Sequence, residues 1–158
     1  MNWQGTLDAI YLAPEAKAPI ERVEAVEVIA GRGLKGDRYF KGMGAFSRFP
    51  GKRREVTLIR AEALAEAIAE FGIALADGEH RRNLVVSKVP LAELVKQRFR
   101  VGEAVLRGVQ ICAPCKYLVR VTEEPRIFDA LVGRGGLRAE ILETGTVRQG
   151  AVVAPLDV

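Results

Sequence analysis

The segment "LRAEILETGTVRQGAVVAPL", residues 137–156, indicates the class of fold most directly. It divides into three short apolar stretches, and the divisions fall at Gly145 and Gly150. Glycine adopts turn conformations that most residues avoid, so this pattern predicts strand, turn, strand, turn, strand. Many short strands separated by turns are typical of an antiparallel, barrel-like sheet.

Two short helices are expected among the strands. The first follows residues 55–59 and has an apolar stripe at helical spacing, and Gly72 stands where a helix C-cap glycine would stand. The second covers residues 126–133 and ends at Gly133. The stripe of the first helix consists of Ala61, Leu64, Ala65, Ile68 and Ala69.

Strands do not alternate regularly with long helices, which argues against a parallel, doubly wound sheet. We therefore expect one α+β domain over residues 1–158, with a mostly antiparallel, barrel-like sheet and a few short helices. The further strands expected are residues 5–13, 23–30, 55–59, 84–87 and 98–111, the last broken at Gly102.

The composition is that of an ordinary globular domain. The 158 residues are 49% hydrophobic and 28% charged, with a formal net charge of +4. No apolar run approaches the roughly 18 residues that span a bilayer, and the N-terminus has no signal-type segment. We expect a cytoplasmic protein with no membrane contact, whose two cysteines stay reduced.

A glycine-rich, basic segment over residues 31–54 is too long for an idle loop, and it begins with "GRGLKG" (31–36). This matches G-x-G-x-x-G, but a dinucleotide site also needs a helix directly behind the glycines. The residues that follow, "DRYFKGMG", have no helical stripe. A set of structural turns and a glycine-rich anion cradle both remain open.

Arginines recur in clusters along the chain, and Arg81-Arg82-Asn83 stands directly before a predicted strand. The planar guanidinium grips phosphate or carboxylate through two hydrogen bonds, so these groups suit a phosphorylated ligand. The alternative is a solvated charged surface. Few aromatic residues accompany the arginines, so nucleic acid is not specifically signalled.

Both cysteines lie in "ICAPCKYL" (111–118), spaced as C-x-x-C. A thioredoxin-type pair belongs at a helix start in a βαβ unit, which is not expected here. A zinc site built from Cys112, Cys115 and His80 would have only three protein ligands. One working thiol beside basic groups is the third interpretation, and two buried apolar cysteines is the fourth.

Taken together, the motifs resemble the MOSC domain, the C-terminal domain of molybdenum-cofactor sulfurases, which also occurs as small free-standing bacterial proteins. The resemblance covers about residues 5–154 and implies a β-barrel-like α+β fold. The segments that carry it, in order, are "GLKGDR" (33–38), "EVTLI" (55–59), "RRNLVV" (81–86), "RFRVGEAVL" (98–106), "CAPCKYL" (112–118) and "RGGLRAEILETGTVRQG" (134–150).

The resemblance also implies the site. Cys115 is the expected working cysteine, a molybdenum ligand or a persulfide carrier. The molybdenum cofactor would be held by Gly36, Asp37 and Arg38 from the glycine-rich segment and by Arg81, Arg82 and Asn83. Cys112 is outside the family pattern, so its role stays unassigned. Nothing resembles a pyridoxal-phosphate desulfurase, so no pyridoxal phosphate is expected in this chain.

Three functions follow as hypotheses. The first is a molybdoenzyme component that reduces small N-hydroxylated compounds, with electrons from a reductase protein. The second is a sulfur or cofactor carrier without turnover of its own, supplied by a cysteine desulfurase. The third is a barrel that binds anions or nucleic acid and has structural cysteines. The first two share one site, so the sequence does not separate them.

Overall fold

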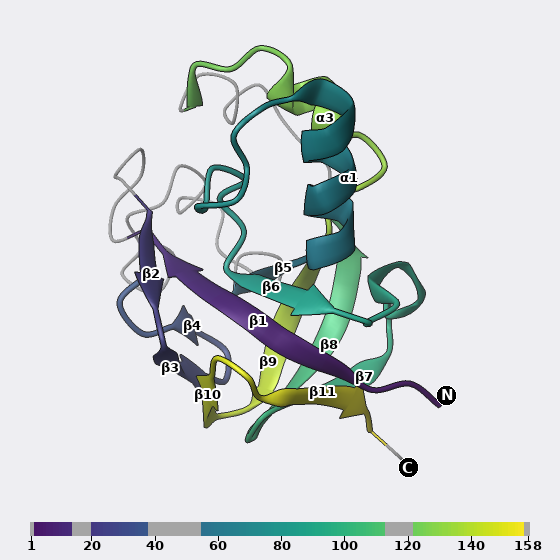
Figure 1. Cartoon of the computed structure of the whole chain (residues 1–158). Helices are drawn as coiled ribbons and strands as arrows, with labels where there is room; N and C mark the ends of the chain where they lie inside the picture. The colour runs from purple at the N-terminus through teal and green to yellow at the C-terminus, as the bar shows by residue number, and fades with distance from the viewer. Residues whose placement is uncertain (1, 14–19, 38–54, 113–121, 157–158) are drawn as a thin grey trace.

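The computed structural model describes residues 2–13, 20–37, 55–112 and 122–156 (Figure 1). Strands dominate, as expected, and the helices are short. The elements are β1 (Gly5–Leu12), β2 (Glu21–Val23), β3 (Ala25–Ile29), β4 (Gly33–Leu34), β5 (Val56–Arg60), α1 (Ala61–Phe71), β6 (Leu84–Ser87), the 3₁₀ turn η2 (Leu91–Glu93), β7 (Arg98–Val101), β8 (Ala104–Ile111), α3 (Ile127–Leu131), β9 (Leu137–Glu143), β10 (Gly145–Arg148) and β11 (Val152–Pro155).

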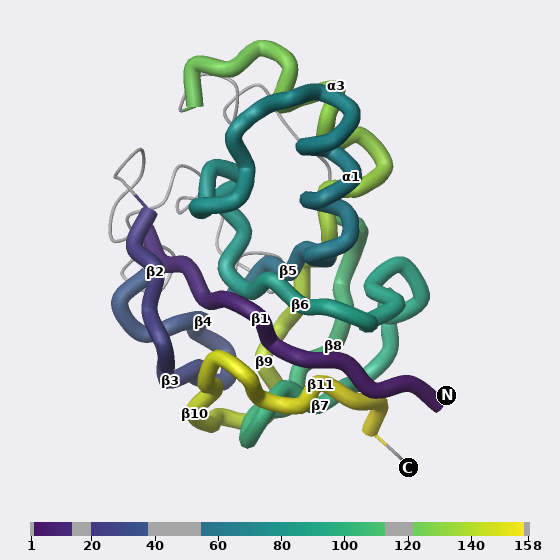
Figure 2. Tube along the Cα trace, viewed as in Figure 1, coloured from purple at the N-terminus to yellow at the C-terminus, as the bar shows by residue number. Residues whose placement is uncertain are grey.

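The main sheet closes on itself. Its order is β11-β7-β8-β9-β5-β6-β1-β2, and β11 also pairs with β1, so seven strands of the described chain form a ring with β2 attached outside it. The closing pair joins Gly5 to Val153, which brings the two ends of the chain to one corner (Figure 2). The barrel-like α+β fold expected from the sequence is confirmed.

Most neighbouring strands are antiparallel, but β5 and β6 run parallel. A parallel pair needs a crossover connection, and α1 with the segment after it supplies one. Strands β10, β3 and β4 form a separate three-stranded sheet. The expected strand–turn–strand–turn–strand at residues 137–156 is confirmed as β9, β10 and β11, and β10 leaves the barrel to join this small sheet.

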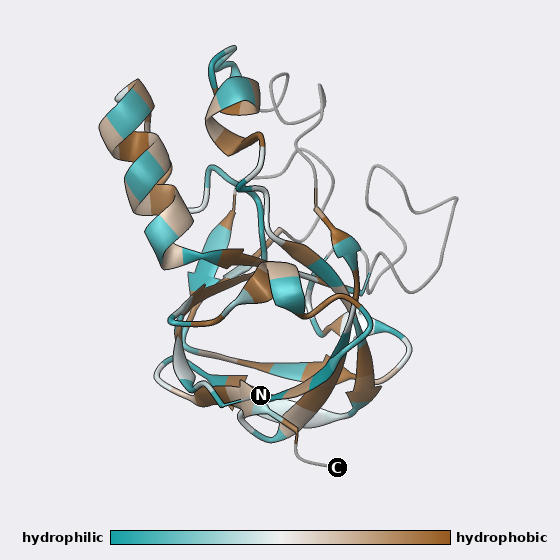
Figure 3. Ribbon diagram, turned by 90° about the vertical axis from the view of Figure 1, so that its right-hand side faces the viewer, coloured by the Kyte–Doolittle hydropathy of each residue, from teal (hydrophilic) through white to brown (hydrophobic). Residues whose placement is uncertain are grey.

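Two apolar clusters hold the fold together. The first fills the barrel with side chains such as Leu58, Leu84, Phe99 and Leu137, all fully buried. The second lies between the barrel wall and the two helices, which sit together at one end of the barrel (Figure 3). This end is therefore thicker and has more connecting chain than the other.

Helix α1 ends as predicted, because Gly72 adopts the left-handed conformation with φ of 64° and its N–H bonds to Ile68. The predicted stripe is only partly right. Ala65 and Ala69 are exposed, whereas Ala63 and Ala67 are buried beside Leu64. Alanine is small and occurs on several faces of this helix, so its spacing alone did not identify the buried face.

At the helical end of the barrel, four strand ends come level with Leu58 in the middle of β5. Adjacent partners across this end run from β1 through β6, β5 and β9 to β8 without a break. The pairs are Ile10↔Leu84, Leu84↔Leu58, Leu58↔Leu137 and Leu137↔Ile111. Residues just beyond these strand ends are therefore brought close together, although they come from distant parts of the chain.

Gly136, which leads into β9, illustrates how tightly this end is packed. Its φ is +96°, and a Cβ atom there would lie 1.9 Å from the carbonyl oxygen of Leu58. Gly133 also has a positive φ, of 76°, but nothing lies within 4 Å of its Cβ position. A Cβ atom would thus cause conformational strain at both glycines, but a steric clash only at Gly136.

We predict that Gly136→Ala lowers the free energy of unfolding by about 3 kcal/mol or more, because it adds a backbone clash to the conformational strain. The matched change Gly133→Ala should cost only about 1 kcal/mol, from conformation alone. Urea denaturation of both variants measures the difference. Equal losses would contradict the close approach of β9 to β5.

Candidate functional site

The predicted site residues that the structure describes gather at the helical end of the barrel. Arg81, Arg82 and Asn83 precede β6, and Gly36 and Asp37 follow β4. The structure brings Asp37 and Asn83 into contact, with Asn83 Nδ2 3.5 Å from Asp37 Oδ1. Arg38 and Cys115 lie outside the described residues.

The side chain of Asn83 forms hydrogen bonds with Tyr11, Asp37 and Thr57, and we call these four residues the Asn83 cluster. The Oδ1 atom of Asn83 accepts bonds from the backbone N–H and the hydroxyl of Thr57, both at 3.1 Å. Its Nδ2 donates to the carbonyl of Tyr11 at 3.2 Å as well as to Asp37. An amide has two donors and two acceptor positions, so this side chain is fully used within the protein.

The backbone of Asn83 extends β6 by one residue. Its N–H bonds to the carbonyl of Thr57 in β5, and its carbonyl accepts from the N–H of Tyr11 in β1. Asp37 completes the arrangement, because its buried carboxylate accepts the N–H of Ala13 at 3.0 Å. The Asn83 cluster therefore ties together β1, β5, β6 and the chain that follows β4.

Arg82 is held in a similar way. Its Nε donates to the carbonyl of Gly135 at 2.8 Å, and one terminal nitrogen donates to the carbonyl of His80 at 3.3 Å. The first bond fixes the segment before β6 against the segment before β9. Arg82 thus positions its neighbours from a buried location.

His80 is fully buried and neutral. Burial lowers its pKa from 6.5 to about 3, and the Arg82 guanidinium acts in the same direction. Its Nδ1 accepts the N–H of Arg82 at 2.9 Å, which places the imidazole proton on Nε2. The ring stands edge-on to Tyr11, with centroids 5.3 Å apart. Nε2 is inaccessible, and within the described part of the chain it has no hydrogen-bond partner.

Arg81 faces a cavity. Its backbone has a φ of 57°, a left-handed conformation that costs energy in a residue other than glycine. The hydrogen bonds of Arg82 and Asn83 hold this conformation in place. The cavity, of about 230 Å³, is also bounded by Asp77, Glu79 and Thr122. Thr122 is the first described residue after the segment that contains Cys115.

Cys112 directly follows the end of β8. Its side chain is fully buried, and its N–H bonds to the carbonyl of Gly136 at 2.7 Å. A thiol with no access to solvent behaves as a small apolar residue. No cluster of three or more histidine, cysteine and acidic side chains that could hold a metal occurs in the ranges that the structure describes.

Sequence reasoning did not identify two members of the Asn83 cluster. The sequence pattern places Thr57 only within a buried strand. A polar residue within the otherwise apolar "VTLI" is nevertheless a usable signal for a buried hydrogen bond. Tyr11 contributes only backbone groups to Asn83, so no sequence pattern could have indicated it. The glycines at 31, 33 and 36 all have positive φ, which fits a set of turns.

The fold and site together define a small α+β barrel with buried arginines and a neutral histidine at one end. A scan against protein families matches residues 46–154 to the MOSC domain, which is more than half of the chain. The chain therefore belongs to the MOSC domain family. No curated protein matches the sequence.

Solved structures show the same fold. YuaD from Bacillus subtilis matches with a TM-score of 0.75 and 20% identity, over 96% of this chain and 97% of that one. YiiM from Geobacillus stearothermophilus matches with a TM-score of 0.72 and 14% identity, over 97% of this chain and 75% of that one. For YiiM from Escherichia coli the values are 0.67 and 18%, over 100% and 71%.

No described helix has both the length and the apolar character needed to cross a membrane.

We predict that Asn83→Asp lowers the free energy of unfolding by about 3 kcal/mol near neutral pH. The new carboxylate would face the Asp37 carboxylate and the Tyr11 carbonyl, where only a donor fits. The double variant Asn83→Asp with Asp37→Asn restores a donor between the two side chains and should recover part of the loss. Urea denaturation measures all three proteins, and a double variant no better than Asn83→Asp would contradict this contact.

A second prediction concerns pH. The pKa of His80 is depressed in the folded protein, so the unfolded chain binds more protons between about pH 6.5 and 3, and stability falls as the pH falls through this window. From about pH 6.8 to 5.2 the loss due to His80 should be about 1–2 kcal/mol. His80→Asn retains an acceptor for Arg82 and cannot titrate, so its pH dependence should be flatter by that amount. Identical slopes would mean that His80 is not buried in its neutral form.

Proposed function

We propose that this protein binds the molybdenum cofactor at the helical end of the barrel, with Cys115 as the metal ligand. In this role it is a cytoplasmic component that reduces N-hydroxylated compounds. The observation that carries the proposal is the cavity beside Arg81 in a MOSC-family chain. The preceding residue, His80, has a buried Nε2–H without a partner among the described residues.

Arg81 and His80 supply donors that suit an anionic group such as the phosphate of a pterin cofactor, and such a group would have to lie away from Asp77 and Glu79, which line the same cavity. Arg81 offers a permanently charged donor set beside a cavity. The Nε2–H of His80 is a buried donor without a partner among the described residues, and such groups are costly unless a ligand or water satisfies them. A neutral histidine also donates to an anion without titrating near pH 7.

The other predicted binding residues support the proposal indirectly. The side chains of Asn83 and Arg82 hydrogen-bond within the protein and hold the segment that presents Arg81 and His80. Asp37 anchors the same segment through Asn83. We assign these three a positioning role, and we assign the contacts with the cofactor to Arg81 and His80.

The position of Cys112 supports Cys115 as the ligand. Cys112 is fixed at the same barrel end through its bond to Gly136, which adjoins the Gly135 carbonyl that holds Arg82. Cys115 follows Cys112 by three positions in the sequence. Cys112 itself is buried and offers no accessible sulfur.

When bound, the cofactor supplies the two-electron chemistry. Reduction of a hydroxylamine consumes two electrons and two protons and releases an amine and water. We assign the delivery of electrons to a separate reductase protein. In this proposal Arg81 and His80 bind and orient the cofactor. The Asn83 cluster keeps the segment before β6 rigid.

We predict that protein made in a host that synthesises the molybdenum cofactor contains molybdenum near one equivalent, measured by elemental analysis. Cys115→Ser should lose the metal. Arg81→Gln should bind less, because it loses a charged contact. Cys112→Ala is the matched control: it replaces a buried apolar sulfur and should retain most of the metal. Hydroxylamine reduction with a reductase partner should follow metal content.

Equal metal retention in Cys115→Ser and Cys112→Ala would contradict the ligand assignment. Metal-free protein with a cyanide-labile sulfur on Cys115 would instead identify a persulfide carrier supplied by a cysteine desulfurase. Absence of both, with salt-sensitive binding of nucleic acid, would favour the simple anion-binding barrel.

A further inference from the structure

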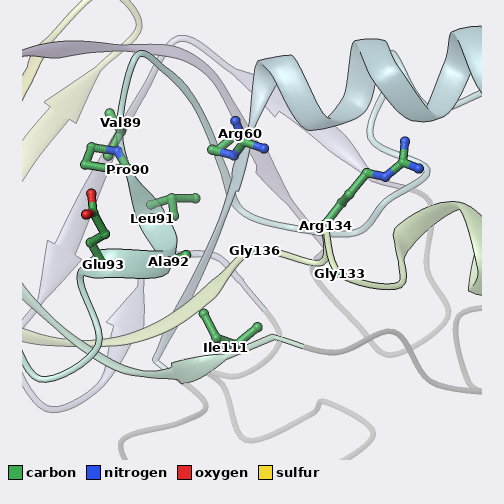
Figure 4. A pocket seen from close by; sticks show the side chains of 10 residues that line it. All are labelled: Arg60, Val89, Pro90, Leu91, Ala92, Glu93, Ile111, Gly133, Arg134 and Gly136. Atoms are coloured by element: carbon green, nitrogen blue, oxygen red, sulfur yellow. The ribbon is translucent and has the colours of Figure 1, made fainter.

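A second cavity lies on the outer side of the barrel end, separate from the Asn83 cluster. It has a volume of about 360 Å³ and lies between the start of α1, the 3₁₀ turn η2, the end of β8 and residues 133–136 (Figure 4). Cavities of this size are in the range that holds small organic ligands. None of the residues assigned to the cofactor lines it.

Two arginines, Arg60 and Arg134, line this cavity, and the charge of Arg60 is unmatched among the described residues. Arg60 makes no side-chain hydrogen bond or ion pair with any residue that the structure describes. Arg134 forms an ion pair with Glu70 through one terminal nitrogen. Its other terminal nitrogen, Nη1, is inaccessible to water and has no hydrogen-bond partner in the described chain. In Figure 4, Arg60 lies at the start of α1, and the Arg134 side chain extends away from Arg60 along this helix.

The rest of the wall is mainly apolar. Val89, Pro90 and Leu91 line one side, and Ile111 lies across from Arg60 with 47% of its surface exposed. Ile111 is among the few large apolar side chains that the described surface leaves this open. A ligand with an apolar body would cover it, which is favourable in proportion to the apolar area buried.

Glu93 restricts the charge of the ligand. It lies on the side of η2, away from Arg134, and contributes the acidic group of this cavity's lining. A neighbouring cavity shares Arg60, Val89, Pro90 and Glu93 and adds Glu62 and Lys88. A second negative charge would meet these acidic side chains, so a ligand with a single anionic head, placed at Arg60, is favoured.

We propose that this cavity binds an organic monoanion, a carboxylate with an apolar body. The carboxylate bonds to Arg60, whose planar guanidinium group matches its two oxygens. The body lies along Leu91, Pro90 and Ile111. This site goes beyond the proposed function, because it requires neither the metal nor Cys115.

The test is a titration of the full-length protein with hexanoate, followed by amide chemical shifts in NMR spectra. Saturable shifts should appear at Ile111, Gly133 and Gly136. Hexanamide has the same body without the charge and should bind at least about tenfold more weakly. Arg60→Gln should weaken hexanoate binding by about tenfold.

Two further variants keep the result interpretable. Arg148→Gln removes an exposed arginine on β10, in the separate small sheet, and should leave hexanoate binding unchanged. Glu93→Gln removes the opposing charge and should tighten binding about twofold. Arg60 has no described partner to lose, so Arg60→Gln should retain the dispersed spectrum of the folded protein. Equal binding of hexanoate and hexanamide, or unchanged binding in Arg60→Gln, would overturn the proposal.

Discussion

The side-chain amide of Asn83 joins parts of the chain that are far apart in sequence. It accepts two hydrogen bonds from Thr57 in β5 and donates to the carbonyl of Tyr11 in β1 and to the carboxylate of Asp37. These groups are buried or partly buried, where an unmatched polar atom is costly. The arrangement at this barrel end therefore depends on one residue that satisfies all of them together.

Closure of the barrel explains why the polar groups collect where they do. Seven described strands pair in a ring, so the wall has no free edge at which a ligand could add. The interior is filled by apolar side chains. The ends remain, and at the helical end the described residues before β6 contact β5, Asp37 and the residues before β9. For this topological reason Arg82 and Cys112 both hydrogen-bond to the chain just before β9, at Gly135 and Gly136.

Local patterns predicted most of the elements. Gly145 and Gly150 correctly separated β9, β10 and β11, and Gly72 correctly ended α1. The buried face of α1 was partly wrong, because alanine carries little information about direction. The predicted binding residues Asp37 and Asn83 do meet, but their hydrogen bonds are made within the protein. The position of a side chain in a motif says little about whether its polar atoms are already occupied.

The sequence by itself determined the class of fold, the family and the set of residues from which a site could be built. These depend on local properties: strand periodicity, turn glycines and the order of short motifs. The tertiary structure alone decided that β5 and β6 run parallel, that His80 is neutral, and that Arg60 and Arg134 share a cavity. Each of these depends on burial and on neighbours 26 to 74 positions away or on the closing of the ring, and such long-range contacts leave no local pattern in the chain.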